Sequence, residues 1–243
     1  MMKVYLDNAA TTPLDREVFE SMLPYFCDNY GNPESQHFFG RQAEYAVIHA
    51  REQTANALGA QEHEIYFTSS ATEANNWVLK GIVDASKKTK KRIITSAIEH
   101  SSIINCVEDL ERHGVEVVKI LPDQDGVITP ESVVNELNEN TILVSIMLAN
   151  NEIGTIQPIK EICATVKKYN PEILFHTDAV QAIGTLNVKV NALGVDLLTL
   201  SAHKFYGPKG IGALYIKKGT KIDRLIAGGN QERGLRGGTS NVP

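Results

Sequence analysis

Polar side chains follow two short apolar runs of the sequence, at the points where buried strands would end. Lys204 comes shortly after the run Leu197–Leu200, and Asp178 comes directly after the run Ile173–Thr177. A lysine amine in a partly desolvated crevice has a lowered pKa and forms Schiff bases with carbonyl groups. A buried carboxylate needs a partner, and a protonated ring nitrogen of a cofactor can be that partner.

Other predicted strand ends carry hydroxyl, amide and imidazole groups. His100 follows the run Arg92–Ser96, where it either faces a ligand or caps the next helix. The small residues from Thr68 to Asn76 either present N–H groups and hydroxyls to an anion or simply cap a helix. The segment Asn150–Gly154 either orients a ligand oxygen or holds a loop. Together with Lys204 and Asp178, these groups supply what pyridoxal phosphate requires from a protein.

Alternating strands and helices must position these side chains. From about residue 64 onward, short apolar runs alternate with amphipathic stretches, a pattern typical of βα units around a mostly parallel sheet. Ligands of such sheets bind at the carboxyl ends of the strands. We expect seven strands, at Glu64–Thr68, Arg92–Ser96, Glu116–Leu121, Ile142–Leu148, Ile173–Thr177, Leu197–Leu200 and Ile211–Ile216.

The first 60 residues do not follow the βα pattern. They predict an extended arm over residues 1–14, which leads into helices and then into one large domain over residues 15–243. Apolar residues at helical spacing, together with capping signals, indicate where the helices lie. We expect a helix interrupted near Pro24, a long helix over Phe38–Leu58, helices over Ser101–His113 and Pro158–Tyr169, and one that starts with Thr129 as N-cap.

Composition argues against several functional classes. The chain has 243 residues with 24 Lys+Arg against 29 Asp+Glu, and this net charge of −5 argues against a nucleic-acid partner held by a general field. No apolar run approaches the roughly 18 to 20 residues that span a bilayer, and the start lacks a signal-peptide core, so we expect no membrane partner and a cytoplasmic location. Cys27, Cys106 and Cys163 are odd in number and lack metal-site spacing, so no metal is expected.

Seven segments, in order along the chain, resemble motifs of the cysteine desulfurases of the NifS/IscS family, within the class V aminotransferase group. The resemblance implies an α/β fold, the aspartate-aminotransferase-like large domain of fold-type I enzymes, with pyridoxal 5'-phosphate as cofactor. Family members continue beyond residue 243, so we expect the small C-terminal domain, which carries the catalytic-cysteine loop and the arginine for the substrate carboxylate, to be absent. The segments are Tyr5–Pro13, Gly31–Pro33, Ala71–Glu73, Asn150–Gly154, Asp178–Gln181, Ser201–Lys204 and Gly234–Thr239.

The resemblance also implies roles for the matching side chains. Lys204 would bond covalently to the cofactor, His100 would stack on its ring and move protons, and Asp178 would pair with the ring nitrogen. Asn151 and Gln181 would contact the phenolic oxygen. The other implied cofactor-binding residues are Ala71, then Thr72, Ser201 and His203 on the phosphate, and Thr239, which would reach the phosphate of the partner subunit in a homodimer.

The implied reaction removes sulfur from L-cysteine as an enzyme persulfide and leaves L-alanine. The sulfur would pass to an acceptor scaffold protein for iron–sulfur cluster assembly or to tRNA thiolation. Two alternatives stay open: a selenocysteine lyase or other class V aminotransferase-like enzyme, and a non-catalytic cofactor-binding remnant or assembly partner. None of the three cysteines lies in a Ser/Gly-rich loop, so we do not expect this chain to complete desulfuration by itself.

Overall fold

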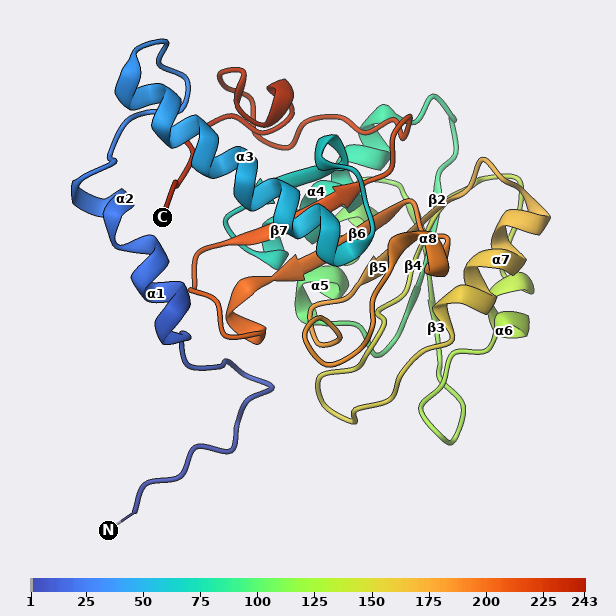
Figure 1. The fold of residues 1–243 in the computed structure, drawn as a ribbon. Coiled ribbons are helices and arrows are strands. Elements are labelled where there is room, and N and C mark those ends of the chain that lie inside the picture. The colour runs from blue at the N-terminus through green and yellow to red at the C-terminus, as the bar shows by residue number, and fades with distance from the viewer. Residues whose placement is uncertain (1) are drawn as a thin grey trace.

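The computed structural model describes residues 2–243, and within them seven strands form one sheet (Figure 1). The order across the sheet is β1-β7-β6-β5-β4-β2-β3, in which β7 is antiparallel to both neighbours and the other pairs are parallel. The expected mostly parallel seven-stranded sheet is therefore confirmed. The strands are β1 (Ile65–Thr68), β2 (Arg92–Ser96), β3 (Glu116–Ile120), β4 (Thr141–Ser145), β5 (Leu174–Asp178), β6 (Leu197–Ser201) and β7 (Gly212–Ile216).

Local signals mark the end of the long helix α3 (Phe38–Leu58) and the start of α2 (Pro24–Cys27). The α3 helix has the expected bounds and stops at Gly59, whose φ of 68° lies in the left-handed region that glycine adopts without strain. The interruption near Pro24 is confirmed, because Pro24 opens a separate helix. The α-helices are α1 (Arg16–Met22), α2 (Pro24–Cys27), α3 (Phe38–Leu58), α4 (Ala71–Ala85), α5 (Ser101–Arg112), α6 (Pro130–Val134), α7 (Ile159–Tyr169) and α8 (Val190–Leu193).

One strand differs from its expected extent. The apolar run predicts a strand to Leu148, whereas β4 ends at Ser145. Beyond Ser145 the N–H groups of Ile146 and Leu148 still donate to β5, at 3.1 and 2.8 Å. The N–H of Met147, which faces the other way, donates instead to the carboxylate of Glu99 at 2.9 Å. A side chain therefore takes the place of β2 as the acceptor, and the regular ladder stops.

Apolar side chains cover both faces of the sheet. Successive residues of β2 and β4 alternate between two buried clusters, since Ile93 and Leu143 pack with α4 and α5, while Ile94 and Val144 pack with α6 and α7. Figure 1 shows the sheet between these two groups of helices. Cys163 lies in one cluster and is 1% exposed, as expected for a core residue.

The N-terminal arm lies against the turn that follows β6. The N–H of Thr12 donates to the carbonyl of His203, and the N–H of Asp15 donates to that of Tyr206, each at 2.9 Å. In Figure 1 the N-terminal end of the chain extends away from the sheet. Among residues 2–243, no helix combines the length and the apolar character that crossing a membrane requires.

Replacement of Phe175 by Ala tests the core on the α7 side of the sheet. Phe175 is fully buried on β5, so its loss leaves a cavity and should lower the free energy of unfolding by about 3 to 5 kcal/mol. Urea unfolding can be followed through Trp77, the single tryptophan of the sequence. The exposed Tyr45 is a matched aromatic control, and Tyr45→Ala should change stability by less than about 0.5 kcal/mol. Equal losses in the two variants would contradict this assignment of the core.

Candidate active site

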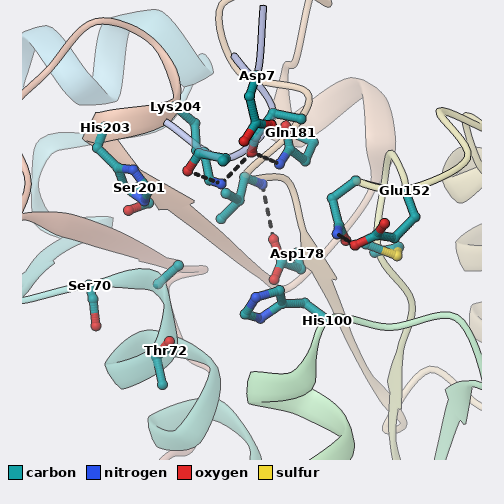
Figure 2. A pocket seen from close by; sticks show the side chains of 16 residues that line it. Asp7, Ser70, Thr72, His100, Glu152, Asp178, Gln181, Ser201, His203 and Lys204 are labelled. Carbon is teal, nitrogen blue, oxygen red and sulfur yellow. Dashed lines mark hydrogen bonds between the residues drawn. The ribbon is translucent and has the colours of Figure 1, made fainter. Parts of the chain in front are cut away.

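A pocket of about 510 Å³ lies where β5, β6 and the start of α4 converge (Figure 2). This volume is in the range of small-molecule binding sites. Its polar lining comes from segments far apart in the sequence, as expected for the carboxyl ends of parallel strands. Nine of the ten residues that the sequence singles out line it, namely Ala71, Thr72, His100, Asn151, Asp178, Gln181, Ser201, His203 and Lys204.

Lys204 lies on a short 3₁₀ turn that directly follows Ser201, the last residue of β6. Its amine donates hydrogen bonds to the arm carbonyls of Ala9 and Ala10, at 2.5 and 2.8 Å. Partial burial lowers the pKa of Lys204, and the nearby carboxylates of Asp7 and Asp178 oppose that shift. A larger fraction of this amine is therefore unprotonated at a given pH than for an ordinary lysine, which favours attack on a carbonyl carbon.

Asp178 is the last residue of β5 and is only 5% exposed. Its carboxylate accepts hydrogen bonds from the N–H of Val180 at 3.0 Å and from the amide of Asn75 at 2.7 Å. Burial raises the pKa of Asp178 above its ordinary value, and these two hydrogen bonds and the proximity of His100 and Lys204 offset only part of that rise. The site thus supplies several groups that stabilise a negative charge on Asp178.

His100 both lines the pocket and caps α5, so the two roles that the sequence leaves open coexist. The N–H of Ser102 donates to its Nδ1 at 3.2 Å, and the hydroxyl of Ser102 lies 2.9 Å from the same atom. The neutral ring therefore carries its proton on Nε2. In Figure 2, Asp178 lies between the His100 ring and Lys204.

Asn75 is a site residue that sequence reasoning does not single out. It is fully buried in α4, and its amide donates both to Asp178 and to the hydroxyl of Ser102, at 2.7 and 2.9 Å. Through Ser102 it joins the Asp178 carboxylate to the His100 ring. The available signal is helical spacing, because Asn75 lies three residues after Thr72 and so shares its side of the helix.

The start of α4 lines one side of the pocket and directs its backbone N–H groups there. Ser70 is the N-cap and accepts a hydrogen bond from the N–H of Glu73, while the first-turn N–H groups of the 15-residue helix carry its positive dipole end. Gly212 of β7 packs directly against this turn, since a Cβ on it would lie 2.8 Å from the carbonyl carbon of Ser70 and 3.0 Å from the nitrogen of Ala71. Any larger residue would displace the turn.

Two further side chains enter from the β6 side. Ser201 is buried at the strand end, and His203 approaches the Thr11 hydroxyl through Nδ1 at 3.1 Å. Burial lowers the pKa of His203, and the nearby Lys204 and Lys209 lower it further. Both side chains line the same pocket as Ser70 and Thr72.

The two asparagines of the loop after β4 fulfil the two roles that the sequence leaves open: one holds the loop and the other faces the pocket. Asn150 is buried and holds the loop, with its amide on the Ile98 carbonyl at 2.7 Å and its oxygen accepting from the N–H groups of Glu152 and Ile153. Asn151 lines the pocket, and so does Gln181, whose amide donates to the carbonyl of Ala9 at 2.9 Å.

Thr239 lies outside this pocket. It lines a groove of about 580 Å³ together with Met22, Phe26 and Val47. The structure therefore does not bring Thr239 to the Lys204 pocket of the same chain. Its implied contact with a partner subunit's phosphate stays a prediction.

Comparisons with known proteins agree on one family for this chain. A family model described as "Aminotransferase class-V" matches residues 4–242. A cysteine desulfurase from Methanosarcina thermophila is 54% identical over 240 residues, which cover 99% of this chain and 59% of that protein. A solved structure titled "NIFS-LIKE PROTEIN" has 47% identity and a TM-score of 0.97, with 99% of this chain and 66% of that chain covered.

A second solved structure, titled "SspA in complex with cysteine", has 42% identity and a TM-score of 0.95, and the match covers 99% of this chain and 69% of that one. The present chain spans about 59% of the length of the Methanosarcina thermophila relative. The matched family model extends over nearly every described residue, and the fold agrees with that of both solved structures. The chain belongs to the aminotransferase class V family.

Proposed function

We propose that this chain is the cofactor-binding part of a pyridoxal-phosphate-dependent cysteine desulfurase. The observation that carries the proposal is the presence of the Lys204 amine and the Asp178 carboxylate in one pocket, which also receives the N-terminal end of α4. L-Cysteine as substrate is supported by the similarity to the Methanosarcina thermophila cysteine desulfurase and to SspA, a protein solved in complex with cysteine.

The donor set of the pocket fits pyridoxal 5'-phosphate. An aldehyde requires a primary amine, a pyridinium nitrogen requires a carboxylate, and a phosphate requires N–H and hydroxyl donors. Lys204, Asp178 and the α4 start supply these groups within about 510 Å³. When bound, the cofactor supplies an electron sink for the bonds at the α-carbon of an amino acid.

The side chains of the pocket divide the work of binding and proton transfer. In this proposal Lys204 takes the proton from the substrate α-carbon, because its lowered pKa makes the amine available as a base. Asp178 would hold the protonated ring nitrogen, and the His100 imidazole would stack on the ring and move protons. Asn151 and Gln181 would hold the phenolic oxygen. Thr72, Ser201 and His203 would hold the phosphate, and Ala71 would also contact the cofactor.

Sulfur transfer needs a thiolate in contact with the substrate. Among the described residues, no cysteine lines the Lys204 pocket. Cys106 and Cys163 are buried, and burial raises the pKa of each thiol to about 11, so neither is a reactive thiolate at neutral pH. The lack of a reactive thiolate supports a second candidate function, in which the chain binds the cofactor but does not complete turnover. A selenocysteine lyase would use the same lysine, aspartate and histidine.

The proposal includes a homodimer in the cytoplasm. Apolar side chains are exposed on the arm and on the first three helices, which also border the groove that contains Thr239. Such a surface is typical of one that a second subunit covers. The sulfur acceptor would be a scaffold protein of iron–sulfur cluster assembly or a thiolation system. The exposed apolar residues are Val4, Tyr5, Leu6, Val18, Phe19, Leu23, Phe26, Phe38, Phe39 and Tyr45.

Replacing Lys204 with Ala tests the covalent attachment. Borohydride reduction should fix pyridoxal phosphate on the wild-type chain at Lys204, and the K204A chain should retain less than about a tenth of that label because no other amine lines the pocket among residues 2–243. Peptide mapping by mass spectrometry gives the labelled residue. Lys209→Ala is the control, since Lys209 is exposed and lies outside the pocket. A label that maps to Lys209 would refute the assignment.

Replacing Asp178 with Ala tests the partner of the ring nitrogen. Loss of a hydrogen bond to a charged group costs on the order of 1.5 to 3 kcal/mol. Cofactor affinity should therefore fall roughly ten- to hundredfold, measured by titration of the apoprotein with pyridoxal phosphate. Asp125→Ala is the control, because Asp125 is an exposed loop residue away from the pocket. Equal affinities in the wild-type and D178A chains would remove Asp178 from the site.

Product analysis tests whether the chain completes the reaction. The isolated chain with pyridoxal phosphate and L-cysteine should change its visible spectrum without releasing stoichiometric alanine, because sulfur transfer requires a thiolate within about 3 to 3.5 Å of the substrate sulfur. Alanine is quantified by amino-acid analysis alongside the spectrum. Sustained alanine release that disappears in the Cys27→Ala chain would contradict this expectation and identify the acceptor.

A further inference from the structure

Glu99 is a buried carboxyl group beside the pocket to which the proposed function assigns no role. It directly precedes His100 in the sequence and is 8% exposed. Its Oε1 accepts a hydrogen bond from the Ser96 hydroxyl at 2.5 Å and another from the Met147 N–H at 2.9 Å. Its Oε2 is buried and has no hydrogen-bond partner within residues 2–243. A buried carboxylate without a cation or a full set of donors is costly, whereas a neutral acid is much less so.

The Glu99 carboxyl joins two strand ends at the edge of the site. Ser96 is the last residue of β2, and Met147 follows β4 and lines the pocket. The same side chain therefore fixes the chain just before His100 and just before Asn151. Both of these neighbours line the pocket, so a displacement of Glu99 would move two groups of the site together.

A second buried carboxyl group, Asp178, lies across the end of β4 from Glu99. Met147 donates its N–H to the Glu99 side chain, and Leu148 donates its N–H to the backbone carbonyl of Asp178. The charge of Asp178 acts on Glu99 and raises its pKa, so ionisation of one carboxyl group disfavours ionisation of the other. The pair then titrates as a coupled system.

The surroundings of the two carboxyl groups decide which one ionises. Asp178 accepts from Val180 and Asn75, and His100 and Lys204 lie close enough to stabilise its charge. Glu99 takes part in no ion pair among the described residues, and its two donors leave Oε2 without a partner. Different environments assign different protonation states to two nearby carboxyl groups, as they do in catalytic pairs.

We propose that Glu99 is a positioning residue that remains a neutral acid at pH 7, holding His100 and the Met147–Asn151 segment in place while the negative charge of the site stays on Asp178. Only the benefit to a cofactor rests on the proposed function, because it is the pyridinium nitrogen that would use the Asp178 charge. The positions and protonation of the two carboxyl groups concern the protein alone.

The pH behaviour of Glu99 follows from its neighbours. The groups that donate hydrogen bonds to it are Ser96 and Met147, which do not titrate, and the charge that raises its pKa is that of Asp178. On β5, His176 is kept neutral because burial lowers its pKa to about 3. Burial, reinforced by the Asp178 charge, raises the pKa of Glu99 from 4.5 to about 8, although its two hydrogen bonds oppose this shift.

The raised pKa of Glu99 predicts the direction in which the stability of the folded chain changes with pH. Below pH 4.5 Glu99 is protonated in both the folded and the unfolded chain and costs nothing. Between pH 4.5 and about 8 the folded chain keeps a proton that the unfolded chain releases, so stability falls as pH rises. Above about pH 8 the Glu99 carboxyl of the folded chain ionises too, and the free energy of unfolding stops falling on account of this group.

Urea unfolding of the 243-residue chain without cofactor, followed through Trp77, tests the proposal. The wild-type unfolding constant relative to that of the Glu99→Gln chain should rise about tenfold per pH unit between about pH 5 and pH 8, because the glutamine cannot titrate. Glu172→Gln is the matched control, since Glu172 is exposed, and its ratio to wild type should stay constant over that range. A constant ratio for the Glu99→Gln chain would overturn the proposal.

The coupling to Asp178 has its own test. In the Asp178→Asn chain the like charge is absent, so the Glu99 titration should end at a lower pH than in wild type, seen by comparing D178N with the D178N/E99Q double variant. An unchanged upper limit would overturn the shared-charge part of the proposal. A role of Glu99 in packing alone would not move this limit.

Carbon-13 NMR keeps the proposal falsifiable if the Glu99→Gln chain does not fold. In the wild-type chain labelled at glutamate, one carboxyl resonance should titrate near pH 8 and shift its midpoint downward in D178N. Titration of every glutamate near the ordinary value of 4.5 would refute the proposal. Because no cofactor is present in either experiment, these outcomes are independent of whether the chain binds pyridoxal phosphate.

Discussion

Burial of the Asp178 carboxylate is the constraint on which the rest of the site depends. A charge at the end of a central strand is tolerated only with donors and opposite charges around it. Val180 and Asn75 supply the donors, and Lys204 and His100 lie close enough to favour the charge. Each comes from a different segment, so satisfying one carboxylate holds together β5, α4, α5 and the turn after β6.

The ion pairs of the C-terminal segment extend this organisation beyond the pocket. Arg236 forms two hydrogen bonds with Glu73, at 2.8 and 3.1 Å, and Glu73 also accepts the N–H of Ser69 at 2.9 Å. Glu73 lies in the first turn of α4, so the start of that helix and the segment that leads to Thr239 are joined. A buried pair between Arg51 and Glu232 ties the same segment to α3. The start of α4 and the segment that carries Thr239 therefore share one support.

Much of the fold could be predicted because local signals and long-range packing agree. The bounds of α3 follow from its apolar spacing and from Gly59, and the apolar runs gave the strands to within a few residues. The extent of β4 could not be predicted, because its ladder ends where the Glu99 side chain takes the Met147 N–H. No local sequence pattern indicates that the Glu99 carboxylate, 48 residues before Met147, accepts this N–H in place of a strand.

The sequence by itself determined the chemical types of the site, since the residues after each apolar run must meet at the carboxyl edge of a parallel sheet. Only the tertiary structure decided how those residues are partnered. Asn75 reaches Asp178 because α4 packs over the sheet. Lys204 meets the carbonyls of Ala9 and Ala10, which lie 195 and 194 residues earlier in the sequence, because the arm lies against the turn after β6. Protonation states depend on such partners and on burial, and neither is a property of the local sequence.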